Sequence, residues 1–237
     1  MAGSFEPAII VSPQRIVIVG YAQNGIQNGG TIVSPQFLNV GATGNLPLEA
    51  LVPTGDNLSD NVFIQQLDAF GRTVVEYGWV DWAGDSGDQE AWIDTDTFEI
   101  AEDVSFTPGQ GLWVMGSATS QGIQSAGKVG TSDVSVTLCN GGITTGNPFP
   151  VTLDLQDIVP EGENLSDNVF IQTLDAFGRT VIEYGWVDWA GDSGDQEAWI
   201  DTDTFEIASD VSFTPGQGLW VMGSSTEQSI RFPAPEL

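Results

Sequence analysis

Two acidic segments carry the side chains best suited to hold a ligand. The first runs from Asp81 to Asp96, and its near copy runs from Asp188 to Asp203. Carboxylates, with glycines that let backbone carbonyls converge, are the ligands that a hard cation such as Ca²⁺ requires. The candidate metal ligands are Asp81, Asp85, Asp88, Glu90, Asp94 and Asp96, with Asp188, Asp192, Asp195, Glu197, Asp201 and Asp203 in the copy.

The spacing of these acids differs from that of the EF-hand loop, and the flanking segments have the composition of strands rather than helices. Acidic residues are abundant throughout the chain, so a solvated acidic loop is the favoured interpretation. Calcium binding is the alternative hypothesis, and Ca²⁺ is the only cofactor that the sequence suggests.

Each acidic segment also contains a tryptophan, Trp82 or Trp189, that could bind a glycan. An indole ring stacks on the apolar face of a pyranose while a neighbouring carboxylate accepts hydrogen bonds from the sugar hydroxyls. Strand alternation places Trp79 and Trp82 on opposite faces, so we expect one of them in the core and the other outside. Core packing is the expected role of most of the eight tryptophans.

The composition excludes several classes of function. The 237 residues include 33 Asp and Glu against 5 Lys and Arg, with a formal net charge of −28 and no His. A surface this acidic repels nucleic acid and anionic membranes. The absence of His removes the commonest general base and zinc ligand, and no P-loop, G-x-G-x-x-G, C-x-x-C or H-E-x-x-H motif is present. We therefore expect no enzymatic activity.

The hydrophobicity of the chain predicts no membrane insertion. No apolar run approaches the roughly 18 residues that a spanning helix needs. The first residues also lack the basic and apolar regions of a signal peptide, so we expect any leader to be absent from this sequence. Cys139 is the single cysteine, which leaves no internal disulfide.

An internal repeat dominates the sequence. Residues 57–117 recur as residues 164–224 with three differences in 61 positions, at an offset of 107. This period is far longer than a solenoid unit and close to the size of a small domain. We expect an N-terminal extension over residues 1–13, a first domain over residues 14–122 and a second over residues 123–237.

Strand-forming residues recur throughout both repeats. Segments 62–67 and 73–82 are rich in β-branched and aromatic residues, and the residues between them, 68–72, include a glycine suited to a hairpin turn. No stretch has a sustained helical period of apolar residues. We therefore predict an all-β fold of two near-identical β-sandwich or β-barrel domains, with about seven or eight strands each.

The N-terminal extension contains a short β-prone run, Ile9, Ile10 and Val11, between Pro7 and Pro13. Such a strand can close an edge of its own domain. Alternatively, it can add to the sheet edge of a second copy, and head-to-tail addition that does not close gives an open filament. These three residues are the candidate assembly strand.

The second repeat resembles uncharacterised bacterial secreted proteins built from tandem β-domains. The resemblance is carried by the segments Gly146-Asn147-Pro148-Phe149-Pro150, residues 174–180 and residues 213–221. It implies secretion and a structural role at the cell surface or outside the cell. We predict an extracellular structural protein that self-assembles into a filament, tube or surface layer. A tandem carbohydrate-binding or calcium-dependent adhesion module is the alternative.

Overall fold

A computed structural model of the chain describes residues 5–12, 15–38, 44–84, 87–191, 194 and 196–236. Regular structure in these residues consists of β-strands and two single-turn 3₁₀ helices, η1 (Leu48–Ala50) and η2 (Leu155–Asp157). The prediction of an all-β fold is confirmed, because no α-helix occurs in the described ranges. The alternating β-branched and aromatic residues of the chain suit pleated, half-buried strands.

The first repeat folds into three sheets. Strands β1, β2, β12 and β4 lie in this order in one sheet, where β6 also pairs with β12; β3, β11, β7, β8 and β9 form the second, and β10 pairs with β5 in the third. The strands are β1 (Phe5–Ser12), β2 (Arg15–Gly25), β3 (Gly29–Val33), β4 (Phe37–Leu38), β5 (Leu46–Pro47), β6 (Leu51–Thr54), β7 (Phe63–Leu67), β8 (Thr73–Ala83), β9 (Gln89–Asp94), β10 (Ser105–Phe106), β11 (Leu112–Gly116) and β12 (Gly122–Val129).

The second repeat forms a similar set of sheets. They have the orders β13-β22-β16, β14-β21-β17-β18-β19 and β15-β20. The strands are β13 (Val134–Thr137), β14 (Gly141–Gly146), β15 (Leu153–Asp154), β16 (Val159–Glu161), β17 (Phe170–Leu174), β18 (Thr180–Ala190), β19 (Gln196–Asp201), β20 (Ser212–Phe213), β21 (Gly218–Gly223) and β22 (Ser229–Phe232). Both repeats contain more strands, many of them shorter, than the seven or eight expected.

The five-stranded sheets of the two repeats share their strand order and register. Trp79 lies opposite Trp92 between β8 and β9, as Trp186 lies opposite Trp199 between β18 and β19. The predicted hairpin is confirmed, because β7 pairs with β8 on either side of residues 68–72.

The apolar core of each repeat lies between two sheets. In the first repeat, Leu51 and Ile123 from one sheet contact a cluster that includes Ile64 and Val114 from the other. A separate cluster fills the second repeat in the same way. The sheets of the described residues are open, and no strand joins β9 to β3 to close a barrel. The barrel alternative is therefore wrong, since closure requires the first and last strands to pair, and the two-layered arrangement resembles the sandwich alternative.

The two repeats differ in the sheet that contains their last strand, which is β12 in the first repeat and β22 in the second. In the first repeat, β2 is eleven residues long and forms a hairpin with the preceding strand β1. Its counterpart in the second repeat, β13, has four residues. β22 is likewise shorter than β12, because Pro233 and Pro235 follow it and a proline nitrogen cannot donate to a ladder. The expected domain boundary between residues 122 and 123 falls inside β12, which pairs with strands of the first repeat up to Val129.

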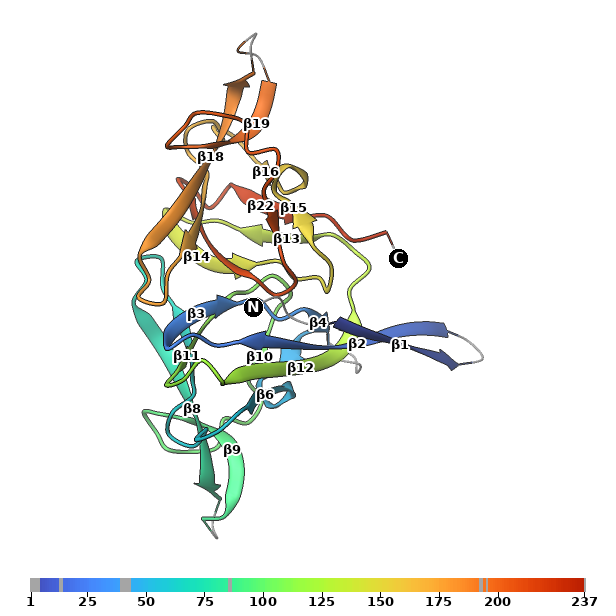
Figure 1. Cartoon of the computed structure of the whole chain (residues 1–237), viewed down its shortest axis with the longest axis vertical. Coiled ribbons are helices and arrows are strands. Elements are labelled where there is room, and N and C mark those ends of the chain that lie inside the picture. Colours follow the sequence, from blue (N-terminus) through green and yellow to red (C-terminus); the bar gives the residue numbers. More distant parts are fainter. Residues whose placement is uncertain are drawn as a thin grey trace.

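The repeats pack against each other through reciprocal contacts of their hairpin turns. The N–H group of Gly142 donates to the carbonyl of Ala69 over 2.9 Å. In the converse contact, a Cβ atom on Gly29 would lie 2.5 Å from the carbonyl oxygen of Ala176, so only glycine fits. Strands β3 and β14 lie side by side in the middle of the molecule (Figure 1).

Trp199 provides a test of the core. Its side chain is fully buried and its indole N–H donates to the Ile158 carbonyl over 2.6 Å. We expect Trp199→Phe to lower the free energy of unfolding by about 2 kcal/mol, because the buried carbonyl loses its donor. Urea unfolding followed by circular dichroism measures the change. Trp189→Phe, at a side chain 39% exposed, should change the free energy of unfolding by less than about 0.5 kcal/mol. Equal losses in both variants would show that the buried hydrogen bond of Trp199 does not stabilise the core.

Candidate functional site

The acidic hairpins lie at opposite ends of the long axis of the molecule, β8–β9 at one end and β18–β19 at the other (Figure 1). Asp81 accepts a hydrogen bond from the Ser59 hydroxyl over 2.9 Å. Asp94 accepts from the backbone N–H groups of Asp96 and Thr97 and so stabilises a turn after β9. These two carboxylates therefore have separate structural partners.

The second copy repeats this arrangement. Asp188 accepts from Ser166, and Asp201 accepts from the backbone of Asp203 and Thr204. The side chains of Asp88, Glu90, Asp96, Glu197 and Asp203 are exposed.

Part of the calcium hypothesis falls on residues that the structure does not describe, namely Asp85, Asp192 and Asp195. Among the residues that it does describe, no group of three or more acidic or cysteine side chains could hold a metal ion. Calcium binding by these hairpins therefore stays a prediction.

Trp82 and Trp189 lie on the outer face of the acidic hairpins. They are 40% and 39% exposed, and their indole N–H groups donate to Asp60 and Asp167 over 3.2 and 3.3 Å. Trp79 instead packs against the core, with its ring centroid 5.3 Å from that of Trp92 in an edge-to-face arrangement. The prediction that one of Trp79 and Trp82 is internal and the other external is confirmed.

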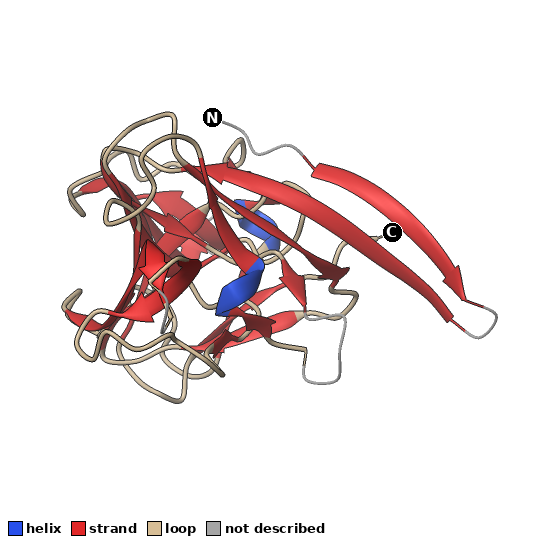
Figure 2. Ribbon diagram, turned by 90° about the horizontal axis from the view of Figure 1, so that it is seen from below, coloured by secondary structure: helices blue, strands red, loops and turns tan. Residues whose placement is uncertain are grey.

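The candidate assembly strand belongs to a long hairpin. Ile9, Ile10 and Val11 lie in β1, which pairs antiparallel with β2 from Phe5 opposite Ala22 to Ser12 opposite Arg15. The hairpin projects from the body of the molecule (Figure 2). No described strand pairs with the other side of β1, so one edge of this arm has no strand partner.

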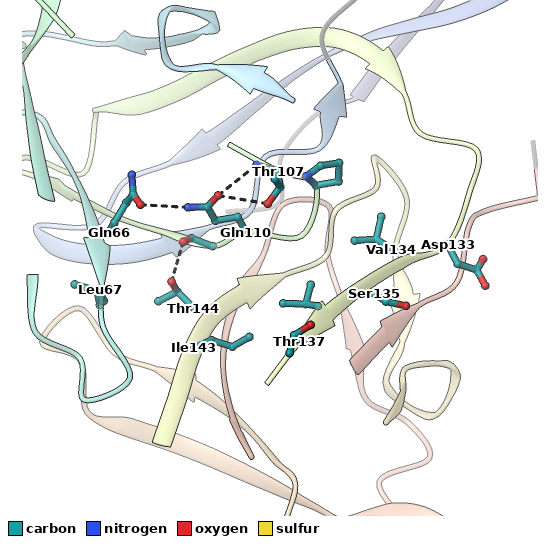
Figure 3. A pocket seen from close by; sticks show the side chains of 13 residues that line it. Gln66, Leu67, Thr107, Gln110, Asp133, Val134, Ser135, Thr137, Ile143 and Thr144 are labelled. Atoms are coloured by element: carbon teal, nitrogen blue, oxygen red, sulfur yellow. Dashed lines mark hydrogen bonds between the residues drawn. The ribbon is translucent and has the colours of Figure 1, made fainter. Parts of the chain in front are cut away.

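β13 also has an open edge. This strand pairs with β22 on one side, and no strand in the described ranges pairs with the other. A cavity of about 630 Å³ lies beside it (Figure 3), lined by all residues from Asp133 to Thr137 and by Thr107, Pro108 and Ile143. Consecutive residues of a strand point to opposite faces. Because residues from both faces of β13 line the cavity, the cavity opens along the edge of this strand.

A groove between the repeats contains aromatic residues that the sequence analysis did not single out. It has a volume of about 410 Å³ and is lined by Trp113 and Phe70 from the first repeat and by Trp220 and Phe177 from the second. Phe70 and Phe177 are 74% and 76% exposed. An apolar residue at the tip of a polar hairpin turn, present in both repeats, was the signal in the sequence that could have indicated this groove.

Each hairpin turn beside the groove is fixed by an ion pair. Arg72 donates to Asp68 over 2.6 and 2.8 Å and lies over the Phe70 ring, 5.3 Å from its centroid. The Arg72 side chain and the backbone N–H groups of Arg72 and Phe70 lower the pKa of Asp68 from 3.8 to about 2. Arg179 lowers the pKa of Asp175 through the same contacts.

Comparisons with known proteins give no match: no family model fits the chain, and no curated protein or solved structure is significantly similar to it. The resemblance to secreted tandem β-domain proteins therefore stays a prediction. The described residues contain no helix with the length and apolar character needed to cross a membrane.

The turn carboxylates predict a pH dependence of stability. Because the pKa of Asp68 is lower in the folded than in the unfolded state, its contribution to stability is complete above the unfolded pKa and is lost as the pH falls through about 2. We expect the double variant Asp68→Asn, Asp175→Asn to be less stable than the parent at about pH 5. The difference should shrink steadily towards about pH 2.

Urea midpoints across this range measure the difference between parent and variant. Asp96→Asn, at an exposed residue outside the hairpin turn, serves as the control. A difference that stays constant with pH would show that the turn carboxylates do not stabilise the fold through their charge.

Proposed function

We propose that this chain is an extracellular structural protein whose copies assemble head to tail by β-strand addition. The outer edge of β1 in one copy pairs with the open edge of β13 in the next. The observation that supports this proposal is that β1 and β13 are both terminal strands of their sheets, each with one edge that no described strand pairs with, and that β1 lies on a projecting arm (Figure 2).

An open edge presents N–H and C=O groups that another strand can pair with. β1 has eight residues and spans about 26 Å at the rise of an extended strand, whereas β13 has four and spans about 13 Å. The arm is therefore long enough to cover β13 completely. Because the two edges are different surfaces, each copy can both give and receive a strand, and repetition yields an open filament.

Charge favours these two edges over other surfaces of the chain. Residues 5–25 contain one acid, Glu6, and one base, Arg15, so the arm carries no net charge. Residues 134–137, Val-Ser-Val-Thr, are also uncharged. In a chain with a net charge of −28, contacts between neutral segments avoid most of the repulsion between copies.

We further propose that the two repeats are near-identical tandem domains. The separate core clusters and the matching order of the five-stranded sheets support this division. Each domain would present one acidic, tryptophan-bearing hairpin. The exposed Trp82 and Trp189, each hydrogen-bonded to a carboxylate, favour glycan-dependent adhesion as a second candidate function.

Head-to-tail addition predicts the behaviour of two complementary variants. Deletion of residues 2–12 removes the donor strand, and a proline on the outer edge of β13 blocks the acceptor. Each variant alone should stay monomeric in size-exclusion chromatography with light scattering, and a mixture of the two should stop at a heterodimer. The parent chain should form longer assemblies, visible by electron microscopy.

The proline that blocks the acceptor edge is chosen by comparing two substitutions at adjacent residues of β13. Adjacent residues of a strand direct their N–H groups to opposite edges, so Ser135→Pro and Val136→Pro are made separately. The variant that keeps the parental melting temperature has lost only the N–H that faces the open edge, and it is the one used in the mixture. Filaments formed by the deletion variant would overturn the proposal.

A further inference from the structure

We propose that the groove between the repeats binds a neutral oligosaccharide, in addition to the assembly edges and apart from Trp82 and Trp189. The groove is formed jointly by the two repeats, with Trp113 and Phe70 from one and Trp220 and Phe177 from the other. Its volume of about 410 Å³ lies within the range of small-molecule sites. The site would be incomplete in either repeat alone.

The indole rings of the groove lie against glycines of neighbouring strands. A Cβ atom on Gly30 would overlap the ring of Trp113, and one on Gly142 would overlap that of Trp220. Glycine at these two positions therefore lets each ring rest on the backbone. Both tryptophans are half-buried, which leaves part of each rigid ring for a ligand. A flat, immobile aromatic surface is what stacking on a sugar requires.

The hairpin turns form the other walls. The turn of the second repeat reaches the tryptophan of the first, since a Cβ atom on Gly178 would lie 3.9 Å from the Trp113 ring. Phe70 and Phe177 are the most exposed large apolar side chains described in the structure. Arg72 and Arg179 lie over these rings, 5.3 Å from the centroids. Exposed apolar side chains grouped in this way mark a binding surface.

The polar groups of the groove are amides and a hydroxyl that other side chains hold in place. The Gln172 side chain donates to Glu183 over 2.5 Å and accepts from the Thr180 hydroxyl over 3.0 Å. Gln65 donates to Glu76 over 2.5 Å in the first repeat. Fixed amide groups of this kind can hydrogen-bond sugar hydroxyls without introducing a charge.

The charge of the molecule favours neutral over anionic ligands. The residues that line the groove are uncharged, whereas the chain as a whole carries −28. Arg72 and Arg179 beside the groove are each paired with an aspartate, so they add no net positive charge that would attract an anion. The field of the acidic chain therefore disfavours anionic glycans, nucleotides and phosphate esters. Two aromatic platforms supplied by equivalent positions of the two repeats fit a ligand with repeating units, and β-linked pyranoses expose the flat apolar faces that stack on indoles. A neutral β-linked oligosaccharide meets both requirements.

The test measures binding of cellohexaose and chitohexaose by isothermal titration calorimetry, with an oligogalacturonate as the anionic probe. We expect at least one neutral hexasaccharide to bind with a dissociation constant below about 1 mM. Trp113→Ala and Trp220→Ala should each weaken binding about tenfold, and the double variant should abolish it, because each removes one stacking platform.

The paired variant Phe98→Ala, Phe205→Ala, at exposed side chains outside the groove, serves as the control and should bind like the parent. Circular dichroism and the melting temperature identify any variant that fails to fold, and Trp113→Phe, which keeps an aromatic ring, should then retain part of the binding. The chain without residues 2–12 should also bind normally, which separates this site from assembly. Absence of binding to both neutral probes, equal binding of the anionic probe, or loss of binding in the Phe98/Phe205 variant would each overturn the proposal.

Discussion

The reciprocal contact of the hairpin turns with the glycine-bearing strands determines how the whole molecule is arranged. Each turn places a backbone carbonyl, of Ala69 or Ala176, against the start of a strand in the other repeat. The glycines at these strand starts have positive φ, 110° at Gly29 and 118° at Gly141, and a side chain there would collide with the carbonyl. Two backbones can approach this closely only where the Cβ atom is missing.

Further backbone contacts continue the junction on both sides. Gly111 donates to the Thr144 carbonyl over 3.0 Å, and Ser34 donates to the Gly216 carbonyl over the same distance. With the repeats joined here, the aromatic groove and the cavity beside β13 are both lined by residues of both repeats. The junction also directs the acidic hairpins to opposite ends (Figure 1), where their repulsion is weakest because charges farther apart than a Debye length are largely screened.

The sequence alone predicted what depends on local pattern. The β7–β8 hairpin follows from two β-prone segments joined by residues 68–72, and the internal position of Trp79 follows from strand alternation. The junction could not be predicted in this way, because β3 and β14 lie outside the nearly identical block and are related by an offset of 112 rather than 107. The groove was missed for a similar reason: aligning the repeats shows what each contains, but not which residues they contribute to one shared surface.

The junction also explains part of the identity between the copies. Residues 68–72 and 175–179 are the same in both repeats, and each turn must fit a glycine pair on the opposite strand while its arginine pairs with its aspartate. A substitution in one turn would disturb a backbone contact that the other repeat depends on. No such constraint acts on the acidic hairpins, which lie far from the junction and yet match as closely. Their identity therefore requires a separate cause, either a recent duplication or a ligand or neighbouring copy that contacts both ends of the molecule in the same way.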